Sequence, residues 1–526
     1  MNSGVLPSAV IRWLTSAVAA LAFVFSSRAA ERINQEGRIL GPLLVVTNSI
    51  LFDTAQADAV VASMQIFPVT SAYNEDVSRL PLATNSSKII AQISSDLSAS
   101  RQTLRLFQEM NYVLAPDSQP LVPINFVDYP DQSDLNGGTY PYGLYPIPTN
   151  MPIEGWPSQT GDETLLASES DTNGIGSTDR HGIIVQPGAG LSFETWETFL
   201  FTNDWQAANG AIFDLNSNAQ RPDGWTSGDA AGLSMFGPLV RFDECERGMV
   251  EHACRLVVKR SLYNSYFYPA THYASTNTLP NLPSMGQRLR LKASFAVPAN
   301  WTIEEKAVLA GLKKYGALVA DNGGFFSISI APDDRWPDNA FDDFSSPGVN
   351  LTNFEVVQST GPTEGPRSPG APVASAGSNY SVTVSQPIQL QGYVAYAGAK
   401  PAILWKLYSG PGTTSNPITF ADATQTNTIV TFNHGGIYTL ELSAADGVHA
   451  VAYDAVVITV TGGFSLLGSL SGTNINLTWT GGTAPFVVQR ADEFPPTTWT
   501  SILTTSAQTA SFPAINTASY FRVKSN

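Results

Sequence analysis

The sequence predicts a mainly β protein, in which a large β-sandwich or jelly-roll-like domain with a few helices precedes two small Ig-like or fibronectin-like β-sandwiches. Short runs of alternating apolar and polar residues recur along the chain, as at residues 438–442, and such runs are typical of strands with one buried face. Gly, Pro, Asn and Asp separate the runs, as expected of turns. A Pro- and Gly-rich linker at residues 359–371 divides the large part from the small modules.

The first 29 residues have the pattern of a signal peptide. Arg12 precedes an apolar run over residues 14–25 that is too short to cross a bilayer, and small residues follow it. We expect cleavage after Ala29 or Ala30 and a secreted, extracellular or periplasmic location. The alternative is that the segment stays as an uncleaved anchor. No later run has the length of a membrane span, so we expect none.

The composition narrows the classes of function. Of the 526 residues, 43% are hydrophobic and 14% are charged, which indicates folded domains and not a disordered polyelectrolyte. The formal net charge of -16 repels nucleic-acid backbones and anionic lipids, so we expect neither as a partner.

Residues 30–358 are predicted to form one large domain that holds the catalytic or glycan-binding function. Up to about residue 154 the sequence is irregular and rich in Pro, Tyr and Asn, as in the wall of a groove. From Gly182 the pattern becomes that of strands. The expected strands cover residues 183–185, 191–201, 211–215, 239–242, 250–258 and 289–295.

One helix is predicted after these strands. Thr302 and Glu305 have the spacing of a capping box, and apolar residues then recur at helical spacing up to the glycines at 323 and 324. A sandwich or jelly-roll with few helices fits this pattern.

The strand expected over residues 191–201 places a carboxylate beside an aromatic ring. Glu194 and Trp196 share one face of the strand, while Phe193 and Phe199 lie on the other. We expect the Glu194 face to lie outside the main core, where the Trp ring could stack on a sugar whose hydroxyls meet the acid. The alternative is a solvated Glu beside a cross-strand Trp.

Glycoside hydrolysis needs two carboxyl groups at a fixed separation. Glu244 follows a predicted strand and precedes Cys245, where a rigid backbone could hold an acid for proton transfer. Asp229 lies in an acid-rich segment, although it could instead cap a short helix beginning at Ala230. We expect Glu194 to pair with Glu244 or with Asp229.

Three histidines of the large domain, His181, His252 and His272, could ligate a metal together with an acid such as Glu194. Their spacing lacks the tight pairs typical of metal sites, so we predict no metal or other cofactor and keep this set as the alternative. His252 alternates with apolar residues, which favours a buried, hydrogen-bonded core histidine as its other role.

The chain has two cysteines, Cys245 and Cys254. In an oxidising compartment, a pair at this short spacing usually forms a bridge. We therefore predict a disulfide that closes the turn around Arg247.

Three motifs mark residues 372–462: the opening at 374–377, the strand with Trp405 followed by residues 409–412, and the run at 435–447. With these motifs the segment resembles a polycystic kidney disease (PKD) type domain. The resemblance implies an Ig-like β-sandwich that serves as a spacer or brings a secreted bacterial enzyme close to its substrate, without catalysis of its own.

Residues 463–526 contain a strand with Trp479 and a late Tyr-Phe-Arg-Val run at 520–523. These features resemble a small fibronectin type III module. The alternative is a generic β-sandwich cap or a sorting tail.

The large domain contains motifs at residues 224–227, 243–253, 288–292, 313–316 and 321–323 that resemble a group of uncharacterised exported bacterial proteins. The resemblance implies one ancestral domain and no particular reaction. The sequence lacks the motifs of serine hydrolases, zinc proteases and phosphate-binding loops.

Together these observations predict a secreted carbohydrate-active protein that acts on an extracellular polysaccharide, most simply as a glycoside hydrolase with paired carboxylates. His252 is a further catalytic candidate. The candidate substrate-binding residues are Trp196, Trp225, Arg255, His272, Tyr273 and Arg290.

Two alternatives remain open. A non-catalytic glycan-binding or surface-adhesion protein would need the same aromatic rings. A polysaccharide lyase would use His252 or His272 with Tyr273 as base and acid. In that case a uronate would be neutralised by Arg255, Arg290 or Lys292.

Overall fold

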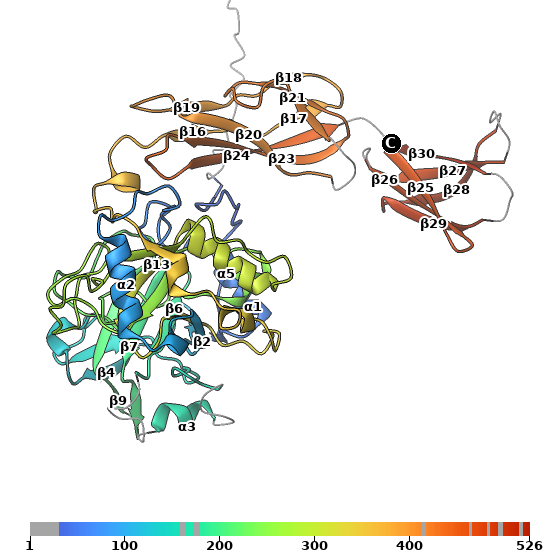
Figure 1. The fold of residues 1–526 in the computed structure, drawn as a ribbon. Coiled ribbons are helices and arrows are strands. Elements are labelled where there is room, and N and C mark those ends of the chain that lie inside the picture. Colours follow the sequence, from blue (N-terminus) through green and yellow to red (C-terminus); the bar gives the residue numbers. More distant parts are fainter. Residues whose placement is uncertain are drawn as a thin grey trace, which may run out of the picture. The chain divides into compact units, whose positions relative to one another are not determined.

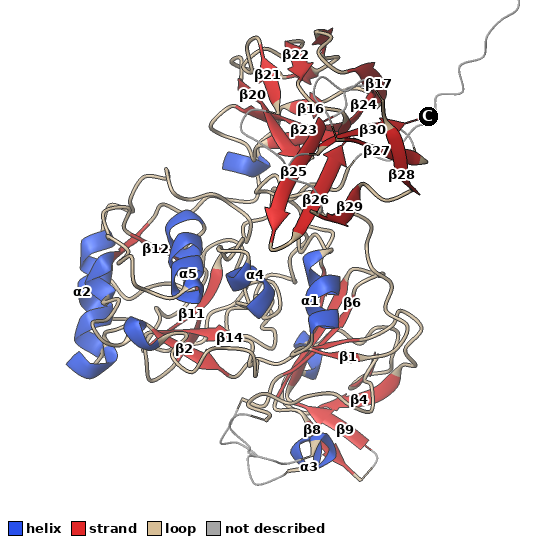
Figure 2. Cartoon of the chain, turned by 90° about the vertical axis from the view of Figure 1, so that its right-hand side faces the viewer, coloured by secondary structure: helices blue, strands red, loops and turns tan. Residues whose placement is uncertain are grey.

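The computed structural model describes residues 31–525 except 158–163, 172–178, 203, 412–416, 462–464, 481–483, 493–497 and 515–518. The expected signal peptide lies outside the described residues. Strands predominate over helices (Figure 2), which confirms the prediction of a mainly β fold. No helix in the described part of the chain is long and apolar enough to cross a membrane.

A five-stranded mixed sheet lies at the centre of the large region, which is coloured blue to yellow in Figure 1. Its strands, in spatial order, are β1 (Ile50–Leu51), β3 (Val113–Leu114), β6 (Gly182–Gln186), β7 (Leu191–Trp196) and β10 (Asn209–Asp214). Both faces of this sheet are buried. Ile183 and Val185 belong to the main core, while Ile184 and Phe193 belong to a second core. Polar side chains on this sheet are therefore enclosed on either face.

The second core is closed by a four-stranded sheet, from which Ile124, Phe126 and Tyr145 contribute. Its strands are β5 (Tyr142–Tyr145), β4 (Val122–Phe126), β9 (Asp204–Ala207) and β8 (Phe199–Phe201).

A six-stranded mixed sheet contributes to the main core through side chains such as Leu256, Leu289 and Val319. Its strands are β15 (Phe354–Val356), β12 (Arg288–Leu291), β13 (Ala317–Asn322), β11 (Cys254–Val258), β14 (Ser327–Ile330) and β2 (Arg105–Gln108). β11 pairs in parallel with β13, and β14 pairs in parallel with β2. The strands that meet here come from widely separated parts of the sequence.

The helices of the large region are α1 (Ala55–Ala62), α2 (Ser86–Asp96), α3 (Leu165–Ser170), α4 (Phe242–Glu246) and α5 (Ile303–Lys314). α5 begins with the predicted capping box of Thr302 and Glu305. It ends earlier than expected, because Gly316 adopts a left-handed conformation at φ +67° and the next residues form β13. The apolar positions assigned to the last helical turns belong to a buried strand.

The segment before residue 154 is more regular than expected. It contains α1, α2 and strands of all three sheets. The expected strand over residues 239–242 is also different, since α4 begins at Phe242 and β11 begins later than predicted, at Cys254.

The first small module is built from three sheets around buried Trp405, Tyr438 and Val456. Its strands are β16 (Val373–Ser375), β17 (Tyr380–Thr383), β18 (Ile388–Gln389), β19 (Tyr393–Ala395), β20 (Ala402–Ser409), β21 (Ile418–Phe420), β22 (Ile429–Phe432), β23 (Gly436–Ala445) and β24 (Ala452–Thr461). This arrangement supports the expected Ig-like β-sandwich.

The last module has two three-stranded sheets, with Trp479 and Phe486 in its own small core. Its strands are β25 (Ser465–Ser471), β26 (Asn474–Thr480), β27 (Phe486–Ala491), β28 (Thr500–Thr505), β29 (Thr509–Pro513) and β30 (Tyr520–Ser525).

Part of the expected linker is folded. Residues Gly365–Arg367 form a 3-10 helix, and Arg367 forms an ion pair with Glu75 at 3.2 Å, with both side chains 4% exposed. Thr360 donates to the same carboxylate at 2.9 Å. The segment therefore has specific partners in the large region, which a semi-extended linker would lack.

Candidate functional site

Four polar side chains form a row across adjacent strands of the six-stranded sheet, and we call them the Arg255 row. They are Asp321 in β13, Arg255 in β11, Ser329 in β14 and Glu109, which directly follows β2. Arg255 donates to Asp321 Oδ2 at 2.9 Å and to Ser329 Oγ at 3.1 Å, and Ser329 Oγ donates to Glu109 Oε1 at 2.8 Å. Strand order, and not proximity in sequence, brings these groups together.

Asp229 fixes the guanidinium of this row. Its two carboxylate oxygens accept hydrogen bonds from Nε and Nη2 of Arg255, both at 3.0 Å. Asp229 is completely buried, and a turn, not the expected helix, follows it. Asp229, a predicted catalytic residue, therefore serves as a buried partner of Arg255. Arg255 was expected to bind substrate, but its guanidinium is bound by side chains of the protein itself.

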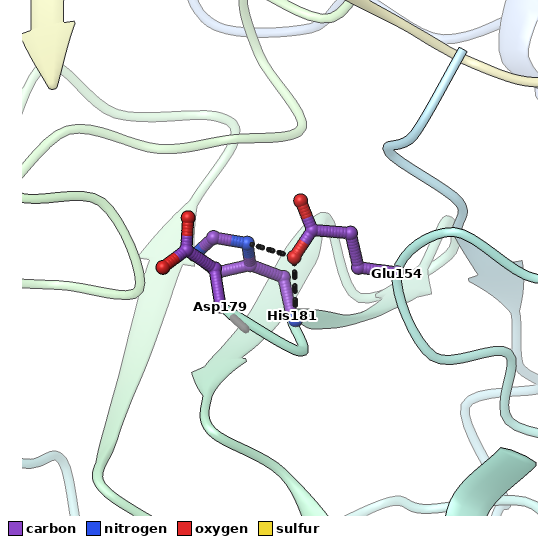
Figure 3. A group of neighbouring side chains, drawn as sticks. All are labelled: Glu154, Asp179 and His181. Atoms are coloured by element: carbon purple, nitrogen blue, oxygen red, sulfur yellow. Dashed lines mark hydrogen bonds and ion pairs between the residues drawn. The ribbon is translucent and has the colours of Figure 1, made fainter. Parts of the chain in front are cut away.

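A second group of side chains lies at the beginning of β6, and we call Glu154, Asp179 and His181 the His181 group (Figure 3). One potential ligand atom from each of the three lies within 4.8 Å of the other two. His181 Nδ1 is 2.9 Å from Glu154 Oε2, and Nε2 is 2.8 Å from the carbonyl oxygen of Gly228. Gly155, the residue after Glu154, donates its backbone N–H to the carbonyl oxygen of Glu109 at 2.9 Å. This hydrogen bond connects the His181 group to the Arg255 row.

Arg180 separates Asp179 from His181 and has a left-handed backbone conformation, with φ at 43°. This conformation is strained for a residue with a side chain, and surrounding contacts must maintain it. The guanidinium donates to Thr198 O at 3.1 Å and to Ser168 O at 2.7 Å, and lies 4.2 Å from the Phe199 ring centroid. These contacts fix the turn that carries both Asp179 and His181.

The carboxylates of the Arg255 row have raised pKa values. Burial, helped by the charge of Glu154, raises the pKa of Glu109 to about 7, against the effect of Arg255. Burial also raises the pKa of Asp321, again against Arg255. Both side chains are partly exposed, so these acids can meet a substrate while one of them still carries a proton near neutral pH.

In the His181 group, the charges of neighbouring side chains outweigh the effect of burial on the pKa values. Burial lowers the pKa of His181, but the Glu154 carboxylate outweighs burial and the value rises to about 9. Burial raises the pKa of Glu154, and the imidazole outweighs it, so the pKa of Glu154 falls below its ordinary value. The two groups therefore form a charged pair at neutral pH, with Asp179 exposed beside them.

An aromatic loop adjoins the Arg255 row. Tyr273 stacks on His272 with ring centroids 5.6 Å apart, and Tyr263, which is 46% exposed, meets Tyr273 edge-on at 5.3 Å. His272 Nδ1 is 2.8 Å from the Ala230 carbonyl oxygen, and Asn322 donates to the Ala274 carbonyl at 2.7 Å. Because Ala230 follows Asp229 and Asn322 follows Asp321, the loop is attached on both sides to the acid cluster.

Glu194 lies inside the protein, which differs from the expectation that its face is outside the core. The side chain is 0% exposed and accepts hydrogen bonds from Ser192 Oγ, Ser234 Oγ and the backbone N–H groups of Met235 and Phe236, at 2.7 to 3.2 Å. The physical reason is that the five-stranded sheet is covered on both faces. Glu194 therefore organises the 234–236 turn.

Glu244 belongs to a separate set of charged residues, which we call the Glu244 cluster: Arg241, Asp243, Glu244, Arg247 and His252. Glu244 accepts from Arg241 Nη2 at 2.7 Å and lies 3.0 Å from His252 Nε2. Burial raises the pKa of Glu244, but Arg241 and then His252 outweigh it and bring the pKa to about 2. Both catalytic candidates from this cluster, Glu244 and His252, are buried and paired with each other.

The other predicted binding residues are dispersed. The Trp196 ring lies 6.0 Å from Tyr129, and the Trp225 ring lies 5.5 Å from the guanidinium of Arg221. Arg290 donates to Glu355 Oε1 at 2.8 Å on the neighbouring strand.

The three histidines of the alternative metal set have separate partners. His252 contacts Glu244, His272 contacts a backbone carbonyl, and His181 has two acids beside it. Among the described residues, His181 is the one histidine of the three that lies close to two other potential metal ligands.

The predicted disulfide is absent: Cys245 and Cys254 are two free, fully buried thiols. Cys245 lies in α4 and Cys254 opens β11, and both fill positions in the main core as small apolar side chains. Burial raises the pKa of each thiol well above its ordinary range, which makes them unreactive.

Sequence reasoning missed Glu109, Glu154, Asp179 and Asp321. Asp321 lies within a strand, Glu109 and Glu154 directly follow a strand and a bridge, and Asp179 lies in the turn before β6. A usable signal was present for two of them. Asp179 is two residues from His181, and Asp321 lies in an Asp-Asn-Gly sequence that ends a run of apolar residues.

Comparisons with known proteins return no match for the whole chain. No protein-family model and no curated protein matches it. Similar solved structures include the human KIAA0319 PKD domain in solution, at 21% identity, with 20% of this chain and 91% of that chain covered and a TM-score of 0.17. Domains A168–A170 of titin share 14% identity over 29% of this chain and 60% of that chain, with a TM-score of 0.14.

A third similar structure contains the first two Ig domains of DIP-gamma. It shares 13% identity over 28% of this chain and 84% of that chain, with a TM-score of 0.15. At this level of similarity none of the three bears on function, which has to be inferred from the site itself.

Proposed function

We propose that this chain is an exported carbohydrate-active protein whose large domain hydrolyses an extracellular polysaccharide at the Arg255 row. The observation that supports the proposal is a pair of partly exposed carboxylates with raised pKa values, Glu109 and Asp321, held on either side of Arg255 and bordered by the aromatic loop. Glu194 and Asp229 are completely buried, so Glu109 and Asp321 replace them in this role.

The aromatic loop suits a sugar ring. The apolar face of a pyranose stacks on Tyr or Trp, and its hydroxyls bind the carboxylates beside it. Tyr263 and Tyr273 lie edge to face, and their loop is attached next to Asp321. A chain of sugars crossing this loop would reach the acids at its end.

The two acids have distinct roles. Glu109, protonated in a large fraction of molecules near neutral pH, donates its proton to the glycosidic oxygen as the bond to the anomeric carbon breaks. Asp321, kept ionised by Arg255, accepts a proton from the water that forms the new bond to that carbon. Water is consumed, and each product gains one hydroxyl.

The test is to incubate the mature chain with a panel of polysaccharides and measure new reducing ends. E109Q and D321N should each lower kcat/KM by at least about 100-fold, because proton transfer usually contributes about 10²–10⁴-fold. D338N, an exposed acid in another loop, is the matched control and should retain full activity. Products that form equally fast with E109Q would contradict the assignment.

Two other outcomes would redirect the proposal. Retention of a polysaccharide without products would indicate a binding or adhesion protein, which the exposed Tyr263 also favours. Unsaturated, ultraviolet-absorbing ends would indicate a lyase. The lyase has less support, because the guanidinium groups of Arg255 and Arg290 already contact Asp229 and Glu355.

A further inference from the structure

The His181 ring has a hydrogen-bond acceptor at each of its two nitrogens. Gly228 O lies 2.8 Å from Nε2, and Glu154 Oε2 lies 2.9 Å from Nδ1. A neutral imidazole has one N–H and can satisfy one of these acceptors. The protonated ring of the charged pair described above donates to both acceptors, and a metal ion on Nδ1 would take the place of the second proton.

The carbonyl of Gly228 determines which nitrogen is available. In metal sites, the ligating histidine usually donates its other N–H to a backbone carbonyl or carboxylate, which fixes the tautomer. Here Nε2 is positioned to donate to Gly228 O, so Nδ1, which faces Glu154, is the nitrogen that would exchange its proton for a metal ion. Asp179 completes the group, with its ligand atom within 4.8 Å of both others.

We propose that Glu154, Asp179 and His181 bind a divalent first-row transition metal such as Zn²⁺ or Mn²⁺. Two ligands about 2.1 Å from a tetrahedral ion lie about 3.4 Å apart, so atoms that now lie within 4.8 Å of one another need to approach by at most about 1.4 Å. Two carboxylates with one imidazole favour Zn²⁺ or Mn²⁺ over Ca²⁺, which prefers a shell of oxygen atoms.

Three protein ligands leave positions for water or substrate, as in catalytic metal sites. Asp179 is exposed and the 14% exposure of the Glu154 side chain keeps the group accessible from solvent, while the strained turn at Arg180 holds two of the three ligands. This site is distinct from Glu109 and Asp321, and its existence does not depend on hydrolysis of a polysaccharide.

Isothermal titration calorimetry on the chelator-treated mature chain tests the proposal. One Zn²⁺ or Mn²⁺ per chain should bind, and D179N should raise the dissociation constant at least about tenfold, as loss of even an outer contact does in metal sites. D338N should bind as tightly as the wild type. Asp179 is exposed, so D179N should melt within a few degrees of the wild type, unlike a change at buried His181.

The outcomes separate this proposal from the preceding one. E109Q should lower kcat/KM for hydrolysis by at least about 100-fold and still bind the ion. Absence of Zn²⁺ and Mn²⁺ binding at millimolar concentration, binding that D179N and E154Q leave unchanged, or tighter binding of Ca²⁺ would each overturn the proposal. Loss of polysaccharide hydrolysis alone would not affect it.

Discussion

Glu244 of the Glu244 cluster and Glu109 of the Arg255 row are both acids among charged neighbours, and they differ in how many cations each one contacts. Glu244 contacts both Arg241 and His252, and its pKa falls to about 2. Arg255 alone faces Asp229 and Asp321 and reaches Glu109 only through Ser329. Burial therefore prevails over Arg255 at Glu109 and raises the pKa of this acid to about 7.

The difference shows that a buried, polar environment does not by itself mark a reactive acid. Where cations match an acid, the carboxylate stays ionised and supports the fold. Where acids outnumber cations near solvent, a proton stays available for transfer. Glu244 is therefore expected to contribute to stability, and Glu109 to activity.

The largest expected effect is on the stability of the Glu244 cluster. E244Q removes the carboxylate that contacts both buried Arg241 and buried His252, which should lower the free energy of unfolding by about 3–5 kcal/mol. E109Q, at a partly exposed site, should change it by less than about 1 kcal/mol. Urea unfolding of both variants measures this contrast, and equal losses would break the comparison.

The second prediction concerns pH. Because the pKa of Glu244 is about 2 in the folded state and 4.5 ordinarily, its contribution is present above pH 4.5 and is lost as the pH falls toward 2. A shift of this size corresponds to about 3 kcal/mol. The stability difference between wild type and E244Q should therefore shrink from pH 5 to pH 3 in urea titrations. A constant difference would show that the lowered pKa is absent.

A third, smaller effect extends the comparison to the buried pair of Glu75 and Arg367. A chain ending at residue 358 loses Thr360 and Arg367, so it should be less stable than a chain ending at 371 by about 1–2 kcal/mol. Thermal melting of the two chains measures this difference, and R367Q in the full chain is the control. Identical melting temperatures would restore the view of residues 359–371 as a simple linker.

The smallest expected effect concerns Cys245, the neighbour of Glu244. With both thiols free, a reductant should leave the melting temperature of the purified protein unchanged within about 1 °C, since no loop closure is lost. Alkylation after denaturation should modify two thiols per chain. A chain that takes up no label until it is reduced would carry the bridge after all.

Much of the fold could be predicted because its signals are local. The capping box at Thr302 and the buried Trp405 depend on neighbouring residues and alternation. The position of Glu194 could not be predicted, because period-two alternation assigns a residue to a face and does not show whether a second sheet covers that face.

The candidate site could be predicted even less. Asp229, Arg255 and His181 stood out as individual residues, but their partners come from distant strands. Strand order decides which side chains meet, and no short-range pattern records that order. The prediction of a disulfide was wrong for a related reason. The close spacing of the two cysteines does not show that one lies in a helix and the other in a strand, each as a side chain of the core.

The parallel pairing of β2 with β14 has a consequence for how the protein matures. Ser329 and Glu109 are separated by 220 residues, and the two strands that carry them to each other pair directly, so β14 must be synthesised before the two can meet. Contacts this distant in sequence form slowly, because a long loop has to close first. During synthesis the growing chain would thus stay without a working acid pair until almost the whole large region has emerged.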